Sequence, residues 1–117
     1  MRWLLLLTLL IACGDPFAAP VSAVRFEPPA IYSSYWQQMA SCLDRDADFR
    51  RVTWYSVPDS GLRYAGEPAY GVWNEPHAIY IEESFLDNPY VVKHEMIHDL
   101  LQTGKHSPIF FTCDPAI

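Results

Sequence analysis

The residues best suited to chemistry are His94, Glu95 and His98, which form the pattern H-E-x-x-H. On an α-helix, residues four positions apart lie one above the other on the same face, so His94 and His98 could bind one metal ion together. Glu95 lies one step round the helix, where its carboxylate could take a proton from a water molecule bound to that metal. The pattern therefore indicates a zinc site with two imidazole ligands and a general base.

A helix must position these residues, and the surrounding sequence predicts one. Asn88 suits the N-cap and Pro89 the first helical position, and we expect the helix to run to about Thr103 and to end at Gly104. Apolar residues lie on most of its faces: Val91, Val92, Met96, Ile97, Leu100 and Leu101. Such a helix is typically buried, and a metal would give its histidines the polar partner that buried groups need.

We expect the third metal ligand to come from the residues that follow this helix. No glutamate follows Glu95, and Gly104 occupies the place of the last histidine in the longer pattern H-E-x-x-H-x-x-G-x-x-H. His106 comes directly after the Gly104 turn, which could bring its ring to the open side of the metal. Asp99 could instead orient a ligand from behind. The alternative ligands are His77, Asp99 and Asp114.

The other periodic stretches predict a small α+β domain around the H-E-x-x-H helix. Apolar residues recur every three or four positions over residues 30–43, which predicts an N-terminal helix. Residues 52–57, 70–73 and 78–82 are rich in β-branched and aromatic side chains and predict a small three-stranded sheet, mixed or antiparallel. Ser107 and Pro108 would cap and begin a short C-terminal helix.

The first residues of the chain have the composition of a targeting segment. Residues 1–12 combine Arg2 with an apolar run that is too short for a bilayer, which needs about 20 apolar residues. They form a predicted signal peptide that ends in Leu10-Ile11-Ala12-Cys13, which resembles a bacterial lipobox, where the cysteine is acylated and becomes the new N-terminus. The alternative is ordinary cleavage after Val21-Ser22-Ala23.

The whole chain has 117 residues, and the part after the predicted signal peptide is long enough for one small domain. We assign residues 30–117 to this domain and residues 13–29, rich in proline and alanine, to a linker that holds it off the membrane. The net charge of −6, without a basic patch, argues against nucleic acid as a partner. A lipid on Cys13 would anchor the protein in the bacterial cell envelope. The inner-membrane retention signal of lipoproteins places Asp directly after the cysteine, so Gly14 at that position favours the outer membrane. Ordinary cleavage would instead leave the protein soluble in the periplasm or secreted.

The cysteine count supports an oxidising compartment. There are three cysteines, so if Cys13 carries lipid, Cys42 and Cys113 remain as a pair. In the cell envelope they should form a disulfide bond. Closing so long a loop would stabilise the fold by about 4 kcal/mol in the chain-entropy model. Two buried free thiols are the alternative.

The H-E-x-x-H residues, followed by His106-Ser107-Pro108-Ile109-Phe110, resemble the SprT-like and WLM-like minimal zincin metalloproteases. Proteins of this broad group carry H-E-x-x-H and then a nearby H-G-x-x-F segment with the third histidine. Ser107 replaces that glycine here, and the resemblance covers about residues 78–113. It implies a zincin-like fold in which the strand at residues 78–82 is the edge strand that binds an extended substrate.

The resemblance also implies a zinc metallopeptidase that hydrolyses peptide bonds in a protein or peptide substrate. Zn²⁺ would be bound by His94, His98 and His106, with Glu95 as the general base. A second donor to the developing oxyanion would be one of three residues: Tyr80, Tyr90 or His77. The alternative function is an envelope lipoprotein with a structural zinc site or a degenerate zincin fold used for binding, although a structural site has no need of Glu95. A third alternative is a lipoprotein that binds no metal.

Overall fold

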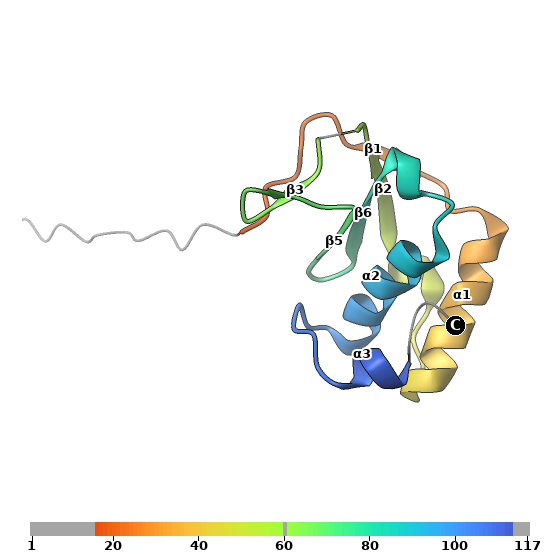
Figure 1. Cartoon of the computed structure of the whole chain (residues 1–117). Helices are drawn as coiled ribbons and strands as arrows, with labels where there is room; N and C mark the ends of the chain where they lie inside the picture. The colour runs from red at the N-terminus through yellow and green to blue at the C-terminus, as the bar shows by residue number, and fades with distance from the viewer. Residues whose placement is uncertain (1–15, 60, 114–117) are drawn as a thin grey trace, which may run out of the picture.

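The computed structural model describes residues 16–59 and 61–113, which form an α+β fold (Figure 1). A mixed four-stranded sheet packs against two long helices, beside a two-stranded hairpin. In chain order the elements are β1 Val24–Phe26, α1 Ala30–Leu43, η1 Phe49–Arg51, β2 Thr53–Val57, β3 Arg63–Tyr64, β4 Glu67–Pro68, β5 Gly71–Asn74, β6 Ala78–Glu82, η2 Glu83–Phe85, α2 Pro89–Leu101 and α3 Ile109–Thr112. None of the helices in these two ranges has the length and apolar character to cross a membrane. The predicted signal peptide, Cys13 and Asp114 lie outside the described residues.

The main sheet has the strand order β1-β2-β6-β5. Strands β2 and β6 are parallel, whereas β1 and β5 run antiparallel to their neighbours. The prediction of three strands was therefore too low, because β1 joins one edge and β3 pairs with β4 in a separate hairpin. The prediction that residues 78–82 form the edge strand is wrong, because β6 pairs on both sides and β5 is the edge.

The two long helices form largely as the sequence predicts. Helix α1 covers Ala30–Leu43, and its inward face consists of Tyr32, Trp36, Met39 and Leu43. Asn88 caps α2, since its side chain accepts a hydrogen bond of 3.2 Å from the backbone N–H of Val91. The predicted end at Gly104 is wrong, because Gln102 already adopts the left-handed conformation, with φ of 55°.

The strands of the sheet carry apolar residues on both faces, because side chains alternate along each strand. On β6, Ile79 and Ile81 belong to the large core beneath α1 and α2, whereas Tyr80 points to the opposite face. A second, smaller core lies on that face and consists of Phe17, Val57, Leu62, Val72 and Tyr80. Helix α2 packs against β5, β6 and α1, so it is buried on most sides.

The residues before α1 are part of the fold. Phe17 is only 5% exposed, and its ring centroid lies 4.8 Å from that of Tyr80. The carbonyl of Pro16 accepts a hydrogen bond of 2.9 Å from the backbone N–H of Ala65. Together with β1, these contacts correct the assignment of residues 13–29 to a linker for the part from Pro16 onward.

A disulfide bond joins the end of α1 to the residue after α3. Cys42 near the end of α1 is bonded to Cys113 directly after α3. The predicted pairing is confirmed, and the alternative of two free thiols is excluded. Helix α3 starts at Ile109 with Pro108 as its N-cap, so the predicted capping by Ser107 is wrong. The disulfide bond holds α3 close to the end of α1.

The burial of Phe17 predicts a stability effect. Replacing Phe17 with Ala should lower the free energy of unfolding by about 3 kcal/mol, because a large ring leaves the second core. Val21 is fully exposed, so Val21→Ala should change this free energy by less than about 0.5 kcal/mol. Urea unfolding of both variants followed by circular dichroism measures the difference. Equal stability of the two variants would show that the segment before β1 does not pack on the domain.

Candidate metal centre

Helix α2 and the loop that follows it bring three imidazole rings together. The Nε2 atom of His94 lies 3.0 Å from Nε2 of His106 and 3.3 Å from Nε2 of His98. One ring nitrogen from each of the three residues lies within 4.8 Å of the others. Nitrogen ligands of a tetrahedral zinc ion at the usual Zn–N distance lie about 3.3–3.4 Å apart. The three histidines could therefore share one metal ion.

The surroundings of His98 determine which of its two ring nitrogens carries the proton. Its Nδ1 lies 2.8 Å from the carbonyl oxygen of Thr103. Because a carbonyl can only accept a hydrogen bond, Nδ1 carries the proton, and Nε2 keeps its lone pair on the side of His94. A hydrogen bond of this kind on the far nitrogen is how proteins orient an imidazole that binds a metal.

Burial keeps the two helix histidines neutral. Burial, together with the neighbouring rings of His98 and His106, lowers the pKa of His94 to about 4. Burial also lowers the pKa of His98, although its hydrogen bond to Thr103 acts in the opposite direction. Both residues are therefore uncharged at neutral pH, which is the form that binds a metal ion.

Phe110 of α3 packs against all three imidazoles. Its ring centroid lies 5.1 Å from that of His94, 4.8 Å from that of His98 and 5.2 Å from that of His106. Phe110 is itself buried, and the disulfide bond that follows it ties α3 to α1. The exposed loop that carries His106 is therefore fixed at both ends, by the end of α2 and by α3.

Glu95 is buried beneath the edge strand β5. Glu95 is only 6% exposed, and burial raises the pKa of its carboxyl group to about 8. A backbone hydrogen bond from Trp73 acts against this shift. Glu95 therefore holds a proton at neutral pH as long as no positive charge lies near it, and a cation among the histidines would favour the carboxylate.

Glycine at position 71 makes room for Glu95. A Cβ atom on Gly71 would lie 2.9 Å from Cγ and 3.1 Å from Oε2 of Glu95, and 3.0 Å from a methyl group of Val91. Real Cβ atoms essentially never approach another atom more closely than 3.0 Å. Any larger residue at position 71 would thus displace Glu95. Gly71 is therefore a positioning residue that the sequence alone did not reveal.

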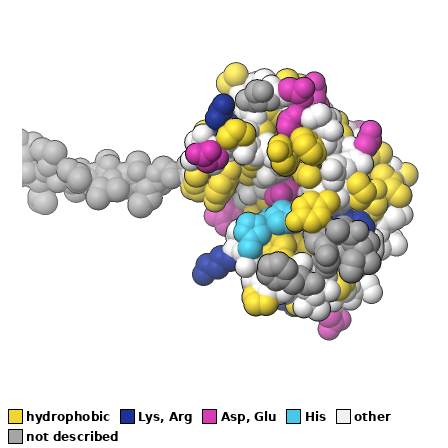
Figure 2. All heavy atoms as spheres, viewed as in Figure 1, with side chains coloured by type: hydrophobic (Ala, Val, Ile, Leu, Met, Phe, Trp, Pro, Cys, Tyr) yellow, Lys and Arg dark blue, Asp and Glu magenta, His cyan; other side chains and the backbone are white. Residues whose placement is uncertain are grey.

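The histidines and Glu95 line one cavity of about 250 Å³. Figure 2 shows histidine side chains at the surface of the molecule with hydrophobic side chains beside them. The residues that line the cavity are Tyr64, Ala69, Gly71, Val72, Trp73, His94, Glu95, His98, Gly104 and His106. A cavity of this size holds a few water molecules or one small side chain.

His77 and Asp99, which the sequence leaves open as ligands, lie apart from the three histidines. The carboxylate of Asp99 is fully buried and accepts hydrogen bonds from Arg51 at 2.8 Å and from the indole N–H of Trp73 at 3.0 Å. Nδ1 of His77 lies 3.2 Å from the same carboxylate. Asp99 thus acts on the site only indirectly, through Trp73, whose ring stacks on that of His98.

None of the residues suggested as oxyanion donors lines the cavity. Tyr80 belongs to the second core and stacks on Tyr55, with ring centroids 4.6 Å apart. Tyr90 stacks on the ring of His94, and His77 contacts Asp99. Tyr64 does line the cavity, and the sequence interpretation missed it. Its hairpin gives only a weak signal in the sequence, because Gly66 suits a tight turn but Ala65 is not a residue that favours the left-handed conformation it adopts.

Comparison with known proteins gives no further guide to this site. No family model, curated protein sequence or solved structure matches the chain significantly.

The three-histidine arrangement predicts which residues control metal binding. Replacing His94, His98 or His106 with Ala should weaken zinc binding by at least 100-fold, because each loss leaves two protein ligands. His77→Ala is the matched control, since Arg51 and Trp73 still bind Asp99, and it should change zinc affinity by less than threefold. Competition with a chelating dye measures the four affinities. Wild-type affinity in His106→Ala would remove this residue from the site.

The buried carboxyl group predicts how the stability of the metal-free protein changes with pH. The folded-state pKa of Glu95 is raised, so the stability that its protonated form contributes is present below the unfolded pKa of 4.5 and is lost as pH rises to about 8. Glu95→Gln cannot ionise and should gain a few kcal/mol relative to wild type between pH 5 and 8, at about 1.4 kcal/mol per pKa unit. Urea unfolding in EDTA at pH 5 and pH 8 measures the difference in unfolding free energy between Glu95→Gln and wild type. The same difference at both pH values would contradict this prediction. The titration of His94 occurs in both proteins and cancels.

Proposed function

We propose that the protein is a zinc-dependent metallopeptidase with a zincin-like domain, which hydrolyses peptide bonds in the bacterial cell envelope. The observation that supports this proposal is the presence of three converging imidazoles and one buried carboxyl group in the same cavity. Metal binding alone would not require a glutamate next to the ligands. The combination is what metal-assisted hydrolysis of an amide needs.

The donor set fits zinc better than calcium or magnesium. Three uncharged imidazole nitrogens suit zinc, whereas calcium and magnesium prefer oxygen ligands. Three protein ligands also leave one tetrahedral position for water or substrate, as in catalytic zinc sites. A zinc ion held there would polarise a carbonyl group and lower the pKa of a water molecule to about 7.

Glu95 serves as the general base and then as the general acid in this proposal. Its carboxylate takes a proton from the attacking water as the water oxygen bonds to the peptide carbonyl carbon. It then passes this proton to the amide nitrogen as the carbon–nitrogen bond breaks.

The edge strand β5 offers the place for an extended substrate. One side of β5 pairs with β6, and three of its residues, Gly71, Val72 and Trp73, line the cavity. A peptide bound along the other side of β5 would form main-chain hydrogen bonds next to Glu95. We therefore propose that the substrate binds along Gly71–Asn74 and not, as the sequence predicts, along residues 78–82.

The packing of Phe17 favours anchoring at Cys13 over cleavage after Ala23. Cleavage after Ala23 would remove Phe17 from the second core and the hydrogen bond between Pro16 and Ala65. Processing at Cys13 keeps both contacts. We therefore propose a lipid-anchored protein in the cell envelope, with peptide substrates and no nucleic-acid partner.

The alternative function is an envelope lipoprotein with a structural zinc site or a degenerate zincin fold used for binding. A structural site is closed by a fourth protein ligand. Among residues 16–59 and 61–113, the only group of potential ligands that converges is His94, His98 and His106. Because the fourth position has no ligand within these ranges, we prefer the hydrolytic proposal.

The proposed role of Glu95 is tested by its amide variant. In zinc-loaded protein, Glu95→Gln should lower kcat for casein peptides by at least 1,000-fold while zinc is retained, because the proton acceptor is lost and the ligands are intact. Glu83→Gln, on an exposed turn, is the matched control and should have wild-type activity. Peptide products are measured by mass spectrometry, and zinc by metal analysis of the same samples. Full activity in Glu95→Gln would refute the mechanism.

A further inference from the structure

We propose that Tyr64 is a catalytic residue, whose phenol O–H donates a hydrogen bond to the carbonyl oxygen of the substrate as negative charge develops on it. This inference rests on the proposed peptidase function and names the second donor that such a reaction needs besides the metal. It also implies a reaction that passes through a tetrahedral, negatively charged transition state.

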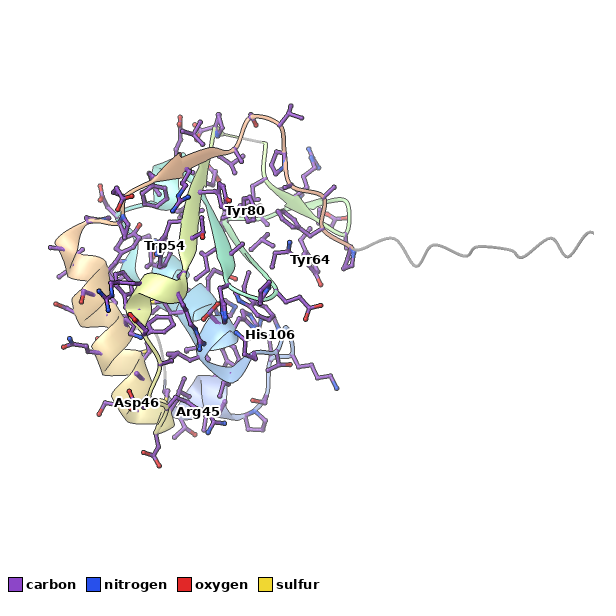
Figure 3. The ribbon with its side chains drawn as sticks, turned by 180° about the vertical axis from the view of Figure 1, so that it is seen from behind. Arg45, Asp46, Trp54, Tyr64, Tyr80 and His106 are labelled. Atoms are coloured by element: carbon purple, nitrogen blue, oxygen red, sulfur yellow. A yellow bond between two sulfur atoms is a disulfide. The ribbon has the colours of Figure 1, made fainter. Side chains whose placement is uncertain are left out.

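Tyr64 lies in the β3–β4 hairpin, outside the main sheet and apart from the metal ligands in the sequence. Its side chain lines the same cavity as Glu95 and the three histidines. In Figure 3, Tyr64 and His106 are labelled on the same side of the molecule. The hairpin and the loop after α2 therefore contribute to the cavity from separate parts of the chain.

The hairpin gives Tyr64 a fixed base. Ala65 and Gly66 form its turn with φ values of 52° and 82°. The Ala65 N–H donates to Pro16, and the Ala69 N–H donates to the Leu62 carbonyl at 3.0 Å. Leu62 is buried in the second core with Phe17. The backbone on both sides of Tyr64 is thus held in place before substrate binds, which is what makes a donor effective.

The phenol ring itself remains accessible. Tyr64 is 45% exposed, so a substrate in the cavity could reach its hydroxyl group. The two other exposed tyrosines of this region are engaged elsewhere: Tyr70 stacks on Phe85 with ring centroids 4.2 Å apart, and Tyr90 stacks on His94. Neither lines the cavity. Tyr64 is therefore the tyrosine placed to contact the reacting carbonyl.

The test compares Tyr64→Phe with Tyr70→Phe in zinc-loaded protein that retains residues 16–117. Loss of one oxyanion donor typically costs 100- to 1,000-fold in kcat. Tyr64→Phe should lower kcat for casein peptides at least 30-fold, with KM and zinc content within twofold of wild type. Tyr70→Phe, which changes another exposed tyrosine outside the cavity, should match wild type in all three quantities. Wild-type kcat in Tyr64→Phe would overturn the inference.

A binding measurement separates this inference from the proposed function. N-phosphoryl-leucyl-tryptophan carries a tetrahedral anionic group that resembles the transition state, and its affinity is measured by titration calorimetry. Tyr64→Phe should bind it at least tenfold more weakly than wild type and Tyr70→Phe. If wild type cleaves no peptide but this difference is found, the peptidase proposal fails and Tyr64 still stands as the donor to a tetrahedral anion. Equal binding by all three proteins, or no binding by wild type, would overturn the role of Tyr64.

Discussion

The structure depends on the rotational position of α2, which is fixed by two sets of contacts on different faces of the helix. On one side, the buried carboxylate of Asp99 is held by Arg51, Trp73 and His77. On the other, the imidazoles of His94 and His98 pack against Phe110 and meet His106. Rotation of the helix in either direction would break one of these sets of contacts. The orientation of the two histidines therefore depends in part on the hydrogen bonds of Asp99, which is not one of the proposed metal ligands.

The same helix carries more polar groups than a buried helix ordinarily tolerates, and each is accommodated differently. Asp99 is paired with Arg51 at 2.8 Å, whereas His98 stays neutral and donates to a carbonyl. Glu95 accepts a backbone hydrogen bond from Trp73, but burial dominates and raises its pKa toward the protonated form. This site is thus electrostatically incomplete by itself, and a cation among the imidazoles would restore the charge of Glu95. Under the proposed function, metal binding would therefore also favour the form of Glu95 that acts as a base.

Local patterns predicted the parts of the fold that a single segment determines. The spacing of Tyr32, Trp36 and Met39 predicted α1, the cap at Asn88 predicted the start of α2, and the cysteine count predicted the disulfide bond. The pattern H-E-x-x-H with His106 named the histidines that the fold brings together.

Features that depend on distant segments could not be predicted in this way. Whether β5 or β6 forms the edge is decided by pairing with β2, which leaves no periodic signal. β1 has only three residues, and the hairpin strand with Tyr64 has two. The need for glycine at position 71 arises only because Glu95, 24 positions later, packs against it.

The central claim is that three imidazoles hold one zinc ion and leave one position open. X-ray absorption spectroscopy of the zinc-loaded protein at the zinc edge measures the number and type of its ligands directly. We expect three imidazole nitrogens and one oxygen at about 2.0–2.1 Å. A shell with four protein ligands, a sulfur ligand or only two imidazoles would contradict this account.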